Sequence, residues 1–130
     1  MAQVLGEQAV QTVEALQASV TLNANITTAQ PIFAVPAGRT FVPTKIVLRG
    51  ASTSLTTASL SFGQNGTTFT DCLATATYTQ LTGPTKQVVI NLGTAAGQVS
   101  AVGATNFGAI FSIAQGSAAT VQCDVFGYML

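Results

Sequence analysis

Side chains able to carry out acid–base or nucleophilic chemistry are scarce in this sequence. The chain has no histidine, which is the commonest general base in enzymes, so no Ser-His-Asp or Cys-His arrangement can form within it. Asp71 and Asp124 would act as an acid–base pair only if the fold brought these distant carboxylates together. Lys86 is followed by Gln87, so no phosphate-binding loop ends there. We expect no catalytic residues and no enzymatic activity.

The two cysteines, Cys72 and Cys123, are too few for a structural zinc site, which needs about four ligands. The sequence has no Asp-rich loop of the kind that binds calcium, so we expect no metal and no cofactor. The pairs Asp71-Cys72 and Cys123-Asp124 mirror each other. A disulfide would form if their strands were neighbours; otherwise both thiols are free, buried and packed as small hydrophobes.

Charge is the most unusual property of the chain. Charged residues make up 6% of its 130 residues and cancel to a net charge of zero, whereas soluble domains carry about 25%. Four cationic residues cannot line a nucleic-acid interface, and a chain that is 48% hydrophobic is not intrinsically disordered. Without an apolar window of about 18 residues or a recognisable secretory leader, we expect no membrane partner.

A neutral, apolar chain needs some way to stay soluble. Its surface is either buried against copies of itself or another protein, or solvated through its many Thr and Ser hydroxyls. Three of the four cationic residues, Arg39, Lys45 and Arg49, fall close together in the sequence. They form either a solvated face that protects a sheet edge or a basic strip that docks on an acidic protein surface.

From residue 20 onward, alternating apolar and polar residues and frequent turn signals predict an all-β domain. Val20 to Thr27 alternates strictly, Pro36-Ala37-Gly38 is a turn, and Pro43 confines the early part of its strand, Phe41 to Leu48, to an edge or a bulge. Asn65-Gly66 predicts a tight hairpin that joins Leu60-Phe62 to Phe69. About eight short strands indicate one antiparallel β-sandwich at 20–130, most plausibly a jelly roll. The predicted strands centre on 20–26, 33–35, 41–48, 60–62, 73–81, 88–92, 107–114 and 120–130.

Residues 1–19 follow a different pattern, with apolar residues spaced by three. The segment is either a short helix that lies on the domain or an arm that becomes ordered against a neighbour. As a docking arm it would use the apolar side chains Val4, Leu5, Val10, Val13 and Leu16.

The last strand is apolar on both faces. Phe126, Tyr128, Met129 and Leu130 would fray in water, so we expect them to be buried. They lie either inside the chain's own sandwich or at an oligomer interface, an axis where several subunits meet.

Two segments carry a resemblance. Pro31 to Arg39, followed by Lys45 to Arg49, resembles a strand–turn–strand segment of small tailed-phage virion proteins, and the composition is similar to that of capsid decoration (cement) proteins. The final residues, Phe126 to Leu130, resemble the terminal strand of trimeric TNF/C1q-like jelly rolls. The resemblance implies a homo-oligomer, with a trimer favoured, that fastens major capsid or other virion proteins. The chain would then reside in the virion, after assembly in the host cytoplasm.

A second interpretation is a binding module of a phage fibre, spike or tail that recognises a host-surface glycan or protein. Such a site needs an aromatic platform for sugars. Tryptophan is absent, and Tyr78 is the only tyrosine outside the C-terminal strand, so this interpretation ranks second.

Overall fold

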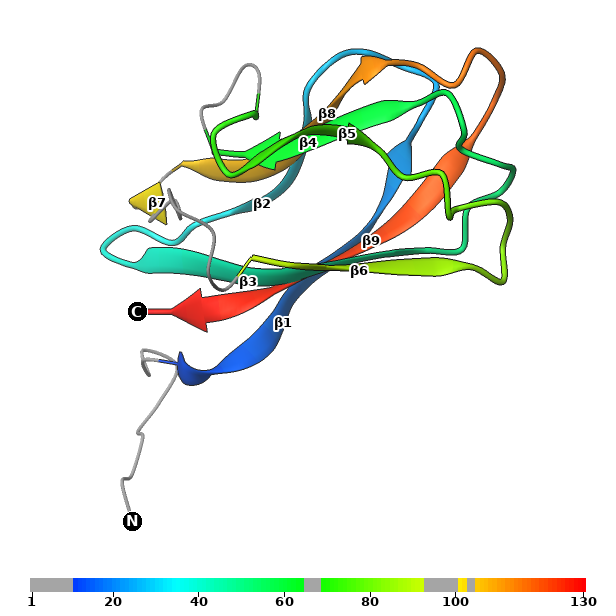
Figure 1. Ribbon diagram of the computed structural model, residues 1–130. Helices are drawn as coiled ribbons and strands as arrows, with labels where there is room; N and C mark the ends of the chain where they lie inside the picture. The colour runs from blue at the N-terminus through cyan, green and yellow to red at the C-terminus, as the bar shows by residue number, and fades with distance from the viewer. Residues whose placement is uncertain (1–10, 65–68, 93–100, 103–104) are drawn as a thin grey trace.

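A computed structural model describes residues 11–64, 69–92, 101–102 and 105–130 of the chain. The described part contains strands and loops but no helix, and therefore no helix long and apolar enough to cross a membrane. The strands are β1 (Gln11–Asn23), β2 (Gln30–Ala34), β3 (Thr40–Arg49), β4 (Ser59–Gly63), β5 (Leu73–Thr77), β6 (Gln87–Asn91), β7 (Ala101–Val102), β8 (Asn106–Ile113) and β9 (Thr120–Met129). They stack in two layers (Figure 1).

The first sheet has the strand order β1-β9-β3-β6, and the two-residue strand β7 also pairs with β3. The second sheet has the order β2-β8-β4-β5. All pairings are antiparallel. Apart from β7, two four-stranded sheets remain, with the crossing connections of a jelly roll. The predicted antiparallel sandwich of about eight strands is confirmed.

Side-chain alternation fills the space between the sheets. On β9, Val121, Cys123 and Val125 are fully buried and face the second sheet. Across the core, the ring of Phe107 meets that of Phe41 edge-on at 5.4 Å between centroids. This alternation is what sends the intervening β9 residues to the outside of the first sheet.

Residues 11–19 correct one expectation. They belong to β1, which pairs with β9 from Gln11 opposite Met129 to Asn23 opposite Thr120, so the predicted helix is wrong there. Two register irregularities interrupt the strand, one of them between Leu16 and Ala18. Such bulges break the two-residue period, which is why the apolar spacing imitated a helix. The rest of the predicted arm, including Val4, Leu5 and Val10, lies outside the described residues.

The predicted turn at Pro36-Ala37-Gly38 is confirmed. Arg39 N–H donates to the Pro36 carbonyl at 3.1 Å, and Gly38 has a φ of +77°. Pro43 adjoins a register shift in β3, so the predicted bulge is confirmed, but the strand is central, between β9 and β6, rather than an edge. Its missing N–H is tolerated because the ladder is already interrupted there.

The predicted hairpin has a different return strand. β4 does pair with its successor, but β5 begins at Leu73, and Asn65-Gly66 lies outside the described residues. Phe69 is buried in the connection with a φ of +44°. A Cβ on Gly108, on the outside of the second sheet, would lie 2.6 Å from Cε2 of Phe69. The connection therefore folds back and packs Phe69 against that outer face.

Gly127 permits β9 to pass close to β3. A Cβ built there would lie 2.6 Å from Cε1 of Phe41 and closer still to the carbonyl oxygen of Val42. Both neighbours are fixed, because Phe41 is fully buried in the core and Val42 is paired in the sheet.

We expect Gly127→Ala to destabilise the domain by about 1–3 kcal/mol, the usual cost of forcing an extra carbon into a packed site. The matched control is Gly83→Ala, because a Cβ at Gly83 meets nothing within 4 Å. Denaturant unfolding of the two variants and the wild type measures the difference. Equal midpoints for both variants would contradict the proposed close approach.

Candidate functional site

The outside of the first sheet gathers five of the twelve residues that the sequence predicts for docking or association, namely Leu16, Lys45, Arg49, Phe126 and Tyr128. We call this surface the outer face. Its side chains alternate with the buried core residues of the same strands. They are Leu16, Ser19 and Thr21 on β1, Gln122, Asp124, Phe126 and Tyr128 on β9, Lys45, Val47 and Arg49 on β3, and Val89 on β6.

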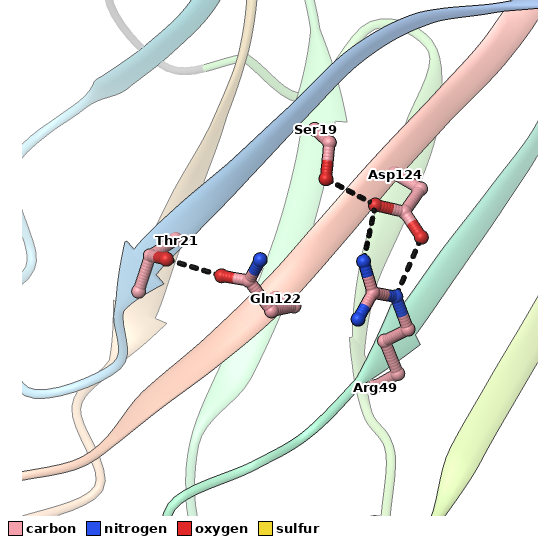
Figure 2. A network of polar contacts seen from close by, with 5 residues as sticks. All are labelled: Ser19, Thr21, Arg49, Gln122 and Asp124. Atoms are coloured by element: carbon pink, nitrogen blue, oxygen red, sulfur yellow. Dashed lines mark hydrogen bonds and ion pairs between the residues drawn. The ribbon is translucent and has the colours of Figure 1, made fainter.

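A charged network crosses the middle of the outer face (Figure 2). Ser19 Oγ donates to Asp124 Oδ1 at 2.6 Å, and Arg49 donates from Nε to Oδ2 at 2.7 Å and from Nη2 to Oδ1 at 3.2 Å. The two-point contact with the guanidinium holds the pKa of Asp124 below its usual value, against the opposing effect of burial, and Ser19 adds to the lowering. The same hydrogen bond raises the pKa of Arg49. One row further along, Thr21 donates to Gln122.

A second pair spans β9 over its aromatic side chain. Lys45 Nζ on β3 lies 3.5 Å from Glu14 Oε1 on β1 and 4.4 Å from the centroid of the Phe126 ring. Glu14 also accepts a hydrogen bond from Thr44. Because β1 and β3 flank β9, this ion pair bridges the two neighbours of β9, with the ring of Phe126 beneath the ammonium group.

The three residues of the predicted basic strip do not act alike. Lys45 and Arg49 both lie on the outer face, but each is paired with a carboxylate. Arg39 lies in the turn before β3. Pairing cancels most of the positive field that an acidic partner would feel, although docking through these residues stays a prediction.

The four residues of the predicted oligomer interface do not share one face of β9. Phe126 and Tyr128 are half-buried on the outer face, whereas Met129 packs against the core. Leu130 is 47% exposed, and its backbone exchanges two 2.8 Å hydrogen bonds with Thr40. Because successive side chains of a strand point to opposite faces, Met129 lies on the core side while Tyr128 lies on the outer face.

Of the predicted docking arm, Leu16 also lies on the outer face and is 53% exposed. Val13 lies in β1. Val89 was missed by the sequence analysis and is 48% exposed at the edge of the same face. Its signal was three consecutive apolar residues, Val88 to Ile90, because a strand that carries such a run must turn one of them outward.

The groups considered for catalysis are kept apart. Asp124 lies on the first sheet, bound to Arg49, while Asp71 precedes β5 of the second sheet and accepts a hydrogen bond from Gln64 N–H at 2.8 Å. Both cysteines are free, Cys123 in the core and Cys72 before β5. Burial, with the nearby Asp71, raises the pKa of Cys72 to about 11, and burial also raises that of Cys123.

An apolar recess of about 10 Å³ lies among core side chains, and its volume is about that needed for one water molecule. Within the described ranges, no three Cys, Asp or Glu residues are close enough to share a metal ion. The recess is lined by Leu48, Leu55, Ala58, Leu60, Tyr78, Leu81, Phe111 and Val121.

Comparison with known proteins rests on structure. No family model matches the sequence, and no curated protein matches it. The fold is similar to a chain in the acid-stable capsid structure of Helicobacter pylori bacteriophage KHP30, with a TM-score of 0.60 and 19% identity over 92% of this chain and 90% of that chain. It is also similar to a chain in the capsid asymmetric unit of cyanophage Pam1, with a TM-score of 0.53 and 16% identity. That match covers 98% of this chain and 92% of the Pam1 chain. At these identities the matches show a shared fold.

The Asp124 network predicts a distinct response to acid. A carboxylate whose folded pKa is lowered stabilises the protein above the unfolded pKa of about 3.9, and this stabilisation is lost as the pH falls through the folded value. We expect the unfolding free energy to fall less steeply below pH 4 in Asp124→Asn than in the wild type, with Ser19→Ala in between. Denaturant titrations from pH 6 to pH 2 measure the slopes. Parallel curves would contradict the network's role.

The thiols should be unreactive in the native protein. With its pKa at about 11, Cys72 is about 0.1% thiolate at pH 8 by the titration equation, and only the thiolate reacts. We expect iodoacetamide to label neither cysteine appreciably at pH 8 and to label both in guanidinium without reductant. Fast native labelling would contradict the buried sites, and protection in guanidinium would reveal a disulfide.

Proposed function

We propose that this chain is a non-enzymatic structural protein of a bacteriophage virion. In this proposal it is a decoration (cement) protein that binds the outer surface of the head lattice as an oligomer in many copies. The observation that carries the proposal is the fold, which matches chains of two phage capsid structures over 92% and 98% of its length.

Chain length supports a decoration protein rather than a principal shell subunit. The matches cover 92% and 98% of this chain and 90% and 92% of the matched chains. The matched capsid chains are therefore of similar size to this one. A chain of 130 residues is short for a subunit that must enclose the genome by itself.

The physical properties of the chain suit a protein that acts through contact area. Apolar surface contributes about 25 cal/mol for each Å² buried, and that gain must first offset the cost of association. An oligomer that touches several lattice sites at once converts modest single contacts into tight binding.

Recognition of a host glycan is less well supported. Tyr78, the only tyrosine outside the C-terminal strand, packs against the hydrophobic core. A ring that spends much of its surface on the core presents less of it to a sugar.

The test is to purify virions with and without this chain. We expect mass spectrometry to find it in many copies per particle, and we expect particles that lack it to release their DNA at a lower temperature. Absence from virions would overturn the proposal. A few copies at the tail, with glycan binding by the isolated protein, would favour the host-recognition module instead.

The predicted docking arm requires a carefully placed deletion. Removing residues 1–19 would delete most of β1, which starts at Gln11, so loss of binding would be confounded by loss of folding. Removing residues 1–10 leaves β1 intact. We expect this shorter deletion to weaken binding to heads that lack the protein by at least about tenfold, or roughly 1.4 kcal/mol, with an unchanged melting temperature. Unchanged binding would overturn the arm prediction.

A further inference from the structure

We propose that the outer face of the first sheet is the surface through which copies of this chain associate. The inference rests on the proposed virion role, to which it adds the interface within the oligomer. Three features of the face carry it, namely its exposed apolar side chains, its internally paired charges and its area.

Exposed apolar side chains mark the two margins of the outer face, and half-buried apolar side chains lie between them. Leu16 on the edge strand β1 is 53% exposed, and Val89 on the opposite edge strand β6 is 48% exposed. Phe126 and Val47 lie between them, both half-buried. Leu16 is the cross-strand partner of Phe126, and Val47 that of Val89. The solvated face of an antiparallel sheet is normally polar, so two partly exposed apolar pairs on one face indicate a surface that is covered in an assembly.

The charges of this face favour a neutral partner. Lys45 is paired with Glu14, and Arg49 with Asp124, so the positive and negative charges cancel locally. Covering charges that are already paired costs less than covering single ones. An acidic or basic partner would find no net charge to complement. A second copy of this chain, whose net charge is zero, meets the face without long-range repulsion.

The area is sufficient for a stable contact. Four strands spaced by about 4.8 Å are about 19 Å wide, and a ten-residue strand is about 34 Å long, as β9 is ten residues long. Because β1 has thirteen residues and β6 only five, the flat area is roughly 600 Å², and side-chain relief increases it. Stable interfaces bury about 800 Å² on each partner, so a stable contact would cover most of this face.

The second sheet supplies a contrast. Its outer face is partly covered by the chain's own Phe69, which packs against Gly108, and Ser61 on that side is fully buried. Ile113 is 53% exposed at the end of β8, the same exposed fraction as Leu16. Its β4 partner across the strands is Ser59, so it lies beside a polar side chain rather than an apolar one.

The experiment compares the masses of charged variants. Leu16→Lys and Val89→Lys each place a cation on the outer face, and Ile113→Lys places the same charge at an equally exposed apolar position of the other sheet. Sedimentation from 1 to 100 µM gives the masses. We expect an oligomeric wild type, a dissociation constant raised at least tenfold in Leu16→Lys and Val89→Lys, and a wild-type value in Ile113→Lys.

Several results would overturn the inference. These are a monomeric wild type at 100 µM, wild-type masses in both outer-face variants, or equal dissociation of Ile113→Lys. Circular dichroism melts check that each variant is folded. If a lysine variant does not fold, Leu16→Thr or Val89→Thr is used in its place. A monomeric wild type that still binds heads would overturn this inference alone, whereas an oligomer absent from virions would overturn the proposed function alone.

Discussion

The position of β9 between β1 and β3 is the constraint on which the rest of the first sheet depends. The last strand of the chain pairs along both neighbours, so β1 and β3, which are separated by β2 in the sequence, are held in one sheet only through it. One side of β9 then fills the core with Val121, Cys123 and Val125. The other side sets the positions of Asp124 and Phe126, around which both ion pairs of the outer face are arranged.

The two ion pairs of the outer face use half of the chain's few charged residues. Glu14, Lys45, Arg49 and Asp124 are half of the eight charged residues of the chain, and all four are placed in cross-strand pairs on one face. Partly exposed pairs of this kind add little to stability. Their clearer effect is electrostatic, because they leave the face neutral while they join β1, β9 and β3 across the sheet.

The fold could be read from the sequence because its signals are local. Strict alternation and the glycine turn at Gly38, whose φ is positive, depend on residues that are neighbours in the chain. The start of β1 could not be read, because register irregularities around Leu16 disrupt the two-residue period. The central place of β3 was hidden for a related reason. A proline indicates an edge or a bulge equally well, and only the strand order decides between them.

The candidate surface was harder to predict, because it depends on register between distant strands. Val47 lies opposite Val89 on one side and Asp124 on the other, and no local pattern states either pairing. The sequence pointed to apolar residues in β1 and β9 separately, as an arm and as an axis. The jelly-roll order makes Leu16 and Phe126 direct cross-strand partners. One residue of the predicted arm and one of the predicted axis therefore lie side by side on the same face, a placement that neither end of the chain indicates by itself.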